Sequence, residues 1–259
     1  MDLNLGNKVF IVTGGAKGIG AAISKTIAAE GGVVVVVGRG KDDNIKIVDE
    51  RIKAGGKASY VTAELATAKA CREVIDFTSE KYGRIDGLVN NAGINDGVGL
   101  ENGSPEKFFE SLQKNLSHYY TLAHYALPFL KKGKGNIVNI GSKVATTGQG
   151  NTSGYAASKG AINALTREWA VELLPYSIRV NTVLPAEVWT PLYENWIKSL
   201  PNPQEKLAQI VSKIPLEKRM TTSEEIADMT VFLLSSRSSH TTGQIIFVDG
   251  GYSHLDRSL

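Results

Sequence analysis

Seven short runs of β-branched and other apolar residues recur along the chain, with longer amphipathic segments between them. The runs occupy 8–13, 33–38, 57–62, 85–90, 135–141, 177–184 and 244–249, and the helix-like segments occupy 19–30, 44–54, 66–81, 105–131, 153–174 and 223–235. Most runs are continuously apolar, which is typical of strands covered on both faces. Strands joined by long crossovers pair in parallel, and right-handed crossovers place helices on both faces. The sequence therefore predicts an α/β fold with a doubly wound parallel sheet.

The length and composition fit one globular domain. The chain has 259 residues, of which 42% are hydrophobic, so we expect a single core over 1–259. Its 29 basic and 26 acidic residues give a net charge of +3 without a basic block, which argues against nucleic acid as a partner. The four histidines lack the spacing of metal ligands, so no metal site is predicted.

The sequence carries no signal for secretion or for a membrane. Cys71 is the single cysteine, which excludes an internal disulfide and fits a reducing compartment. The first residues, MDLNLGNK, lack the basic and apolar regions of a signal peptide. The longest aliphatic run, 33–37, is much shorter than the roughly 20 residues of a membrane helix. We expect a soluble cytoplasmic protein without a membrane partner.

One segment, at about 185–215, interrupts the alternation of strands and helices. It is rich in proline, contains Trp189 and Trp196, and precedes the last helix–strand unit. A long excursion near strand ends is more often a binding lid than a spacer. We therefore predict a substrate lid whose tryptophans close over a ligand. The helix after it is expected to have Ser223 as its N-cap, with Glu224 and Glu225 in the first turn.

The first strand ends in the glycine-rich sequence TGGAKGIG, residues 13–20. Gly14, Gly18 and Gly20 lie between a strand and a helix, where a backbone without Cβ atoms can turn tightly and approach a pyrophosphate. Backbone N–H groups in the first turn, including that of Ile19, would meet the phosphate charge. A nucleotide site is therefore expected here, and the alternative is a tight turn alone. The loop does not end in GK[ST], which disfavours an NTPase.

The second strand indicates which dinucleotide is favoured. In NAD-binding folds a carboxylate about 20 residues beyond the loop holds the ribose hydroxyls, but here the strand ends in Val37-Gly38-Arg39. Arg39 and Lys17 can both face a 2′-phosphate. NADP(H) is favoured and NAD(H) is possible, and the alternative is that both cations are only solvated. Glu64, after the third strand, either meets the adenine or begins a helix.

Tyr155 and Lys159 are four residues apart, so on a helix they share one face. A phenol has a pKa of about 10 and is a poor base at neutral pH, but a nearby cation lowers that pKa. The pair can then transfer a proton to or from an alcohol–ketone pair. A single tyrosine and lysine at this spacing are more often surface residues, so other motifs must decide.

Three further stretches follow strand ends and favour the catalytic interpretation. Ser142 follows the fifth strand and can hold a substrate oxygen. Asn90, Ala92 and Gly93 follow the fourth strand and suit close backbone contact with a cofactor. Asn115 lies inside a helical stretch, where asparagine is unfavourable, and indicates a bound water or a local kink. All converge on the crevice in which doubly wound folds bind ligands.

In this order, the motifs resemble those of the short-chain dehydrogenase/reductase family over essentially the whole chain. The resemblance implies a Rossmann-type subunit with seven strands that transfers hydride between a nicotinamide and a carbonyl or alcohol carbon. It implies that Tyr155 is the acid/base, that Lys159 lowers its pKa and holds the nicotinamide ribose, and that Ser142 orients the substrate oxygen. It also implies that Asn115 holds a relay water, and that the C-terminal VDGGYSHLDRSL lies at a subunit contact of a homotetramer.

One position departs from the family pattern. The proline after the sixth strand is commonly followed by glycine, whereas Pro185 is followed here by Ala186. This difference alters the expected backbone path of the loop. Val188 and Thr190 are still expected to reach the cofactor, Thr190 at its amide.

The side chains expected around the substrate are mostly polar. They are Asn95, Asp96, Ser142, Lys143, Gln149, Asn151, Tyr155, Glu187, Trp189 and Trp196. Polar groups left unpaired by an apolar ligand cost about 1–3 kcal/mol each, so this lining favours a hydroxyl-rich ligand such as a sugar over a steroid. The alternative is that several of these side chains only face water at the rim.

Longer stretches, among them NAGINDGVGLE and PAEVWTPLYENWI, are similar to those of bacterial L-fucose dehydrogenases within the family. This resemblance implies oxidation of the C1 hydroxyl of an aldose, of the L-fucose, L-galactose or D-arabinose type, to the lactone. The alternatives are a hydroxysteroid dehydrogenase or a 3-oxoacyl reductase, and more remotely a non-catalytic nucleotide-binding regulator. His254 is expected either to enter a neighbouring subunit's pocket or to have no role.

Overall fold

Seven parallel strands form one sheet in the computed structural model, which describes residues 2–255. The strands are β1 (Val9–Thr13), β2 (Val33–Gly38), β3 (Lys57–Thr62), β4 (Gly87–Asn90), β5 (Asn136–Ile140), β6 (Arg179–Pro185) and β7 (Ile245–Val248). Their order is β3-β2-β1-β4-β5-β6-β7. The order reverses between β1 and β4, and such sheets bind ligands beyond the carboxyl ends of the strands at this point. The predicted doubly wound α/β fold with seven strands is confirmed.

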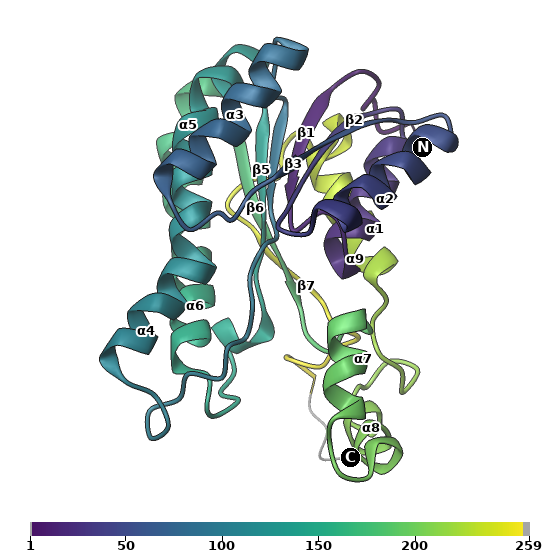
Figure 1. Ribbon diagram of the computed structural model, residues 1–259, viewed down its shortest axis with the longest axis vertical. Coiled ribbons are helices and arrows are strands. Elements are labelled where there is room, and N and C mark those ends of the chain that lie inside the picture. Colours follow the sequence, from purple (N-terminus) through teal and green to yellow (C-terminus); the bar gives the residue numbers. More distant parts are fainter. Residues whose placement is uncertain (1, 256–259) are drawn as a thin grey trace.

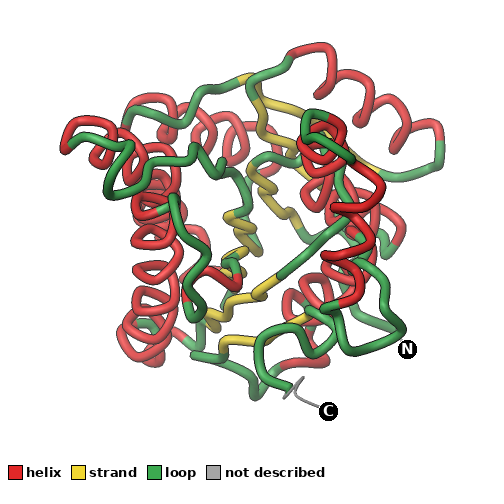
Figure 2. Tube along the Cα trace, turned by 90° about the horizontal axis from the view of Figure 1, so that it is seen from below, coloured by secondary structure: helices red, strands yellow, loops and turns green. Residues whose placement is uncertain are grey.

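Helices cover both faces of the sheet (Figure 1). One face carries α1 (Gly18–Ala29), α2 (Lys41–Lys53) and α9 (Ser223–Leu234), and the other carries α3 (Ala68–Tyr82), α5 (His118–Gly133) and α6 (Ser153–Glu172). α4 (Pro105–Leu112) lies beside α6, whereas α7 (Pro191–Lys198) and α8 (Pro203–Ser212) lie together at the lower end of the view. Figure 2 shows the strands running between the two helical groups. Among residues 2–255, no helix combines the length and apolar character needed to cross a bilayer.

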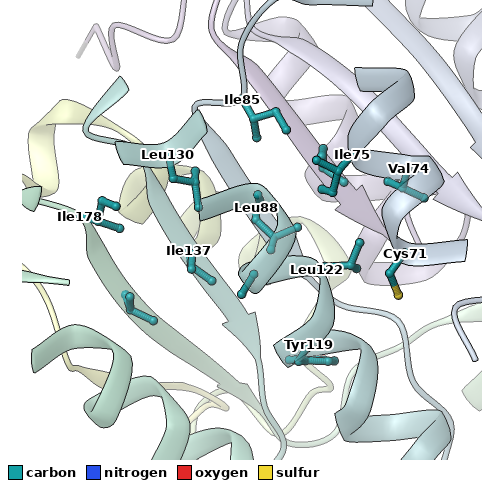
Figure 3. Close-up of a cluster of buried hydrophobic side chains, with 14 of the residues drawn as sticks. Cys71, Val74, Ile75, Ile85, Leu88, Tyr119, Leu122, Leu130, Ile137 and Ile178 are labelled. Atoms are coloured by element: carbon teal, nitrogen blue, oxygen red, sulfur yellow. The ribbon is translucent and has the colours of Figure 1, made fainter. Parts of the chain in front are cut away.

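The five valines at 33–37 show why both faces of the sheet are covered. Val33, Val35 and Val37 pack in one core cluster with residues of α3, α5 and α6, part of which is drawn in Figure 3. Val34 and Val36 pack in a second cluster with residues of α1, α2 and α9. Because successive side chains of a strand point to opposite faces, a continuous apolar run supplies both cores.

The structure divides two segments that the sequence presented as units. The stretch 105–131 consists of α4, a π-helical segment (Gln113–Ser117) and α5, so a local deviation is present at Asn115 as expected. The segment 185–215 contains two helices that the sequence analysis did not predict, α7 and α8. Its start is fixed to a distant loop, because the backbone N of Trp189 donates to the carbonyl oxygen of Thr221 at 2.9 Å.

The N-cap of α9 is Thr222, and the prediction of Ser223 was wrong. Oγ1 of Thr222 accepts a hydrogen bond from the backbone N of Glu225 at 3.2 Å, and the Glu225 carboxylate accepts from the backbone N of Thr222 at 2.8 Å. This reciprocal capping box satisfies two N–H groups at the start of the helix. Thr222 is the N-cap because Glu225, three residues later, can accept a hydrogen bond from the backbone N of Thr222 while its own backbone N donates to the threonine side chain.

Candidate active site

The loop between β1 and α1 is shaped by its glycines. Gly14 and Gly18 have φ angles of +61° and +52°, which residues with a Cβ rarely adopt. A Cβ on Gly20 would lie 2.1 Å from the carbonyl oxygen of Gly14, so α1 packs directly on the loop. Lys17, at the N-cap of α1, supplies no side-chain hydrogen bond to the first turn. The N–H groups there, including that of Ile19, therefore fit the oxygens of a pyrophosphate.

Thr13 and Asn91 bind this loop to the segment after β4. Oγ1 of Thr13 accepts from the backbone N of Asn91 at 2.8 Å and of Ala92 at 3.0 Å, and Nδ2 of Asn91 donates to the carbonyl oxygen of Thr13 at 2.8 Å. A Cβ on Gly93 would lie 3.0 Å from Oδ1 of Asn115. Ala92 and Gly93 are thus held between the glycine loop and Asn115, where a cofactor could approach their backbone. The sequence analysis missed Thr13 and Asn91.

The side chain of Asn90 does not reach this crevice. It is fully buried, and its Nδ2 donates to Oδ1 of Asn139 on β5 at 3.0 Å. The side chain is therefore part of the interior between the sheet and α6. For a cofactor, Asn90 offers its backbone alone.

Both cations expected to meet a 2′-phosphate have carboxylate partners. Nζ of Lys17 lies 2.7 Å from Oδ2 of Asp43, and an Arg39 guanidinium nitrogen lies 3.3 Å from Oε2 of Glu64. All four side chains are at least 41% exposed, and exposed pairs of this kind contribute about 1 kcal/mol or less. A phosphate can therefore replace the carboxylates at low cost. Glu64 faces Arg39 as its partner, beside the ends of β2 and β3.

Ser142, Tyr155 and Lys159 meet between β5 and α6. Ser142 follows β5, and its side chain hydrogen-bonds to Tyr155 in the first turn of α6. Nζ of Lys159 lies 5.5 Å from the centre of the Tyr155 ring. Nζ donates to the carbonyl oxygen of Ile140 at 2.7 Å and to the hydroxyl of Tyr119 at 3.2 Å. The structure thus brings Ser142, Tyr155 and Lys159 together and adds Tyr119, which the sequence analysis missed. Asn115 is close by, because a Cβ on Gly93 would lie 3.0 Å from Oδ1 of Asn115 and 3.8 Å from Nζ of Lys159.

Burial dominates the ionisation of these residues. It raises the pKa of Tyr155, and the hydrogen bond with Ser142 lowers that pKa in part. Burial also lowers the pKa of Lys159 from 10.5 to about 7, since the side chain is almost fully removed from water. The sequence predicted that Lys159 would lower the pKa of Tyr155. In the structure, the effect of burial on the pKa of Tyr155 is larger than the effect of the Lys159 charge. The reason is that Lys159 loses its proton at a lower pH than the phenol does.

Asn115 is fully buried, and both ends of its side chain bind protein atoms. Oδ1 accepts from the backbone N of Ile94 at 2.7 Å, and Nδ2 donates to the carbonyl oxygen of Ser111 at 3.0 Å. These bonds fix the loop after Gly93 beside the π-helical segment. The expected role of Asn115 in holding a relay water stays a prediction.

The residues after β6 contact the glycine loop. Pro185 ends β6, Val188 is buried, and Oγ1 of Thr190 caps α7 by accepting from the backbone N of Tyr193 at 3.2 Å. A Cβ on Gly18 would lie 3.3 Å from Cγ2 of Thr190. The segment therefore follows a path beside the cofactor crevice despite the alanine after Pro185.

A partly buried cluster of Lys143, Glu187 and Tyr193 links α7 to Lys143, the residue that follows Ser142. Lys143 forms an ion pair with Oε1 of Glu187, and the Tyr193 hydroxyl donates to Oε2 at 2.7 Å. Each side chain of the ion pair is only 12% exposed. The Lys143 ammonium also lies 4.2 Å from the centre of the Tyr252 ring. Burial and the carboxylate of Glu187 raise the pKa of Tyr193, so its hydroxyl remains a donor.

The tryptophans of the predicted lid flank this cluster. Trp189 and Trp196 are 40% and 45% exposed, and their rings lie 6.3 Å and 5.1 Å from that of Tyr193. Trp189 also lines a groove of about 630 Å³ between α7 and α8. These residues provide aromatic surface next to the polar cluster.

The other expected substrate residues lie nearer to solvent. Asn95, Gln149 and Asn151 are exposed, and no hydrogen bond joins them to Ser142 or Tyr155 among the described residues. Asp96 is partly buried, and its Oδ1 accepts from Oγ of Ser111 at 2.8 Å. The structure therefore separates a partly buried polar set, near Ser142, from a solvated rim.

Known proteins share both the sequence and this arrangement. A family model described as enoyl-(acyl carrier protein) reductase matches residues 14–253. The 3-oxoacyl-[acyl-carrier-protein] reductase FabG of Thermotoga maritima is 36% identical over 96% of this chain and 99% of that protein. The chain belongs to the short-chain dehydrogenase/reductase family. It is therefore an oxidoreductase that uses a nicotinamide cofactor, which is the predicted activity class and not the regulator kept as the remote alternative.

Other members of the family are similarly close. L-fucose dehydrogenase of Bos taurus is 35% identical over 97% of this chain and 91% of that protein. The crystal structure of Cj0485 dehydrogenase is 46% identical, with a TM-score of 0.95 over 100% of this chain and 99% of that one. Ligand-free aldohexose dehydrogenase of Thermoplasma acidophilum is 29% identical, with a TM-score of 0.89 over 100% and 99% of the two chains. These relatives establish the family but act on different substrates by name, so they do not identify the substrate of this enzyme.

Proposed function

We propose that this enzyme oxidises the C1 hydroxyl of an aldose, of the L-fucose, L-galactose or D-arabinose type, to the lactone. The observation that carries the proposal is the Lys143–Glu187–Tyr193 cluster next to Ser142. Desolvating an ion pair is costly unless its remaining donors and acceptors are used. A ligand with several hydroxyl groups can use them, whereas a steroid or an acyl chain cannot.

The aromatic residues around the cluster support the same class of ligand. Trp189, Tyr193 and Trp196 offer ring faces and edges beside the charged groups. A pyranose combines hydroxyl groups with an apolar C–H surface, so it matches both kinds of contact. Two similar proteins are an L-fucose dehydrogenase and an aldohexose dehydrogenase, which agrees with a sugar as the substrate.

In this proposal Tyr155 and Ser142 handle the oxygen and the proton. Oγ of Ser142 holds the C1 hydroxyl oxygen, and Oη of Tyr155 takes its proton. Nζ of Lys159 supplies positive charge next to the phenol when it is protonated. A nicotinamide cofactor bound here would supply the hydride acceptor for C1. The residues that would hold the cofactor are Gly14, Lys17, Gly18, Ile19, Gly20, Arg39, Glu64, Asn90, Ala92, Gly93, Tyr155, Lys159, Pro185, Val188 and Thr190.

We also propose that NADP(H) is preferred over NAD(H). Arg39 and Lys17 are the cations available to a 2′-phosphate, and their carboxylate partners are exposed. A guanidinium binds phosphate oxygens through two parallel hydrogen bonds, which a free ribose hydroxyl cannot reproduce. The same two carboxylates, Asp43 and Glu64, can accept from ribose hydroxyls and would allow slower use of NAD(H).

A homotetramer is the proposed assembly. Phe109 of α4, Tyr120 of α5, Val171 near the end of α6 and Leu174 just beyond it are between 55% and 68% exposed. Large apolar side chains gathered on one helical layer often mark an interface. His254 packs on Phe247 of its own β7, with ring centres 4.1 Å apart, and its contact with a neighbour stays a prediction. Residues 256–259 of the expected subunit contact lie outside the described residues.

The proposal is tested by steady-state kinetics on a grid of aldoses against NADP⁺ and NAD⁺. L-fucose, L-galactose and D-arabinose are expected to be oxidised, and a hydroxysteroid is not. A 3-oxoacyl thioester forms a second arm with NADPH, because FabG is as similar in sequence as L-fucose dehydrogenase. Turnover of the thioester without turnover of any aldose would reject the sugar assignment.

A matched pair of variants tests directly whether the Lys143–Glu187–Tyr193 cluster contacts the substrate. Glu187→Gln keeps the side-chain size and removes the charge, and Glu194→Gln removes the charge of an exposed pair with Lys198 on the same helix. A hydrogen bond to a charged group contributes about 1.5–3 kcal/mol, so Glu187→Gln should lower kcat/KM by about 10- to 150-fold. The loss should disappear for the monodeoxy sugar that lacks the contacting hydroxyl. An equal loss of kcat/KM for every deoxy sugar would mean that the Lys143–Glu187 pair only holds α7 in place and does not contact the substrate.

A further inference from the structure

The ammonium of Lys159 lies between two tyrosines, of which the sequence motif accounts for one. Its Nζ is 5.5 Å from the centre of the Tyr155 ring and 5.3 Å from that of Tyr119. Its hydrogen-bond acceptors are the carbonyl oxygen of Ile140 and the hydroxyl of Tyr119. No ion pair among residues 2–255 includes Lys159. The charge therefore depends on two neutral oxygens.

The direction of the Tyr119 hydrogen bonds is fixed by its surroundings. The hydroxyl donates its single proton to the carbonyl oxygen of Ile140 at 3.1 Å, so its lone pairs are left to face Nζ of Lys159. The ring cannot turn away, because Tyr119 is fully buried and packs edge-to-face on His118 with ring centres 4.9 Å apart. Figure 3 shows Tyr119 at the border of the apolar cluster, beyond Leu122.

The hydroxyl is not needed to fill the core. Phenylalanine has nearly the same volume and would avoid burying a polar atom. A hydroxyl in this position is useful when it satisfies another buried polar group, and Lys159 is that group. The hydrogen-bonding triangle of Tyr119, Ile140 and Lys159 joins α5, β5 and α6 directly behind the phenol of Tyr155.

We propose that Tyr119 is a positioning residue for the reaction, which holds Lys159 in place and keeps it protonated beside Tyr155. Tyr119 acts through the lysine and does not touch the substrate. The titratable groups that face Lys159 are His118 and Tyr119 from α5 and Tyr155 from its own helix, α6. His118 is neutral in the working range, since burial lowers its pKa to about 4. Loss of the Tyr119 acceptor therefore acts on Lys159 and, through it, on Tyr155.

Tyr119→Phe tests this role through the pH dependence of alcohol oxidation. With one acceptor removed, the ammonium should lose its proton at lower pH, and the limb of the kcat/KM profile that reports Lys159, near pH 7, should move down by about one pH unit. The limb that reports Tyr155, at higher pH, should not move down, because the phenol gains no positive charge. The matched control is Tyr82→Phe, which removes from the end of α3 a hydroxyl that donates to Oγ of Ser59 on β3, at a distance from the site. Its profile should stay at the wild-type position.

The outcomes divide clearly. A folded Tyr119→Phe enzyme with an unshifted profile, even with lower kcat, would overturn the proposal and leave Tyr119 as a core residue. If Tyr119→Phe does not fold, 3-fluorotyrosine at position 119 keeps the ring and hydroxyl but weakens its lone pairs as acceptors. A smaller downward shift of the limb that reports Lys159 supports the proposal, and a profile identical to wild type refutes it. The test uses any alcohol that the enzyme oxidises, so it does not depend on the sugar assignment.

Discussion

Replacing Lys159 by methionine should make the enzyme more stable at neutral pH, although it removes a residue proposed for catalysis. The ammonium is 2% exposed, and burial lowers its pKa from 10.5 to about 7. The folded state therefore disfavours the charged form, and the difference between the two pKa values corresponds to roughly 5 kcal/mol. Methionine has a similar length and no charge to desolvate, so the variant avoids most of this cost.

The sign of the pH dependence follows from proton binding. Between pH 7 and pH 10.5 the unfolded lysine binds a proton that the folded lysine has lost, so the free energy of unfolding of the wild type rises with pH. Below pH 7 both states are protonated and the full cost applies. From pH 7 to pH 9 the wild type should gain about 2 kcal/mol relative to Lys159→Met.

The assay is urea unfolding of both proteins at pH 7, 8 and 9, at one protein concentration. In this range His118, with a pKa lowered to about 4, and Cys71, with a pKa raised to about 11 by burial, do not change charge in the folded state. Lys69→Met, which removes an exposed ammonium from α3, is the control and should follow the wild type. Parallel curves for the wild type and Lys159→Met would refute the reasoning, because they would mean that Lys159 is hydrated.

Three other changes have defined outcomes. Tyr155→Phe should lower kcat by about 100- to 10,000-fold while cofactor still quenches protein fluorescence, since the hydroxyl moves the proton and the ring is retained. Arg39→Ala should lower kcat/KM for NADP⁺ by about tenfold or more and leave that for NAD⁺ nearly unchanged; equal losses for both cofactors would reject a 2′-phosphate contact. Thr222→Ala removes the capping box with Glu225 and should cost about 1 kcal/mol in urea unfolding, with kcat unchanged.

Most of the fold could be predicted because the relevant signals are local. A continuous apolar run such as Val33–Val37 can be satisfied only by a strand covered on both faces, and the structure has it as β2. The glycine loop, Ser142 and the Tyr155–Lys159 pair are short motifs at strand ends, so their meeting point follows from the sheet topology. The helices α7 and α8 were missed because their prolines and tryptophans suggested a loop, whereas Pro191 and Pro203 stand at helix starts.

The residues that sequence analysis missed depend on contacts between distant segments. Tyr119 lies in an apolar stripe of a helix, so its sequence context indicates a core residue. In the structure its hydroxyl contacts Lys159, 40 positions away in the sequence. Tyr193 has no motif, and it becomes informative only when α7 is placed against Glu187 and Lys143. The desolvation that controls the pKa of Lys159 is likewise a property of the packed interior, and the spacing to Tyr155 does not contain it.

A buried chain of polar side chains explains why the catalytic residues meet at a fixed separation. Asn139 of β5 donates from Nδ2 to Oγ1 of Thr166 on α6 at 2.9 Å, and Thr166 bonds to Oγ1 of Thr182 on β6 at 2.6 Å. β5 leads to Ser142, and α6 carries Tyr155 and Lys159 at its start. Apolar packing alone would allow α6 to slide along the sheet, whereas directional bonds to two strands fix its register. The position of the phenol relative to Ser142 is therefore set three turns along the helix, away from the reacting atoms.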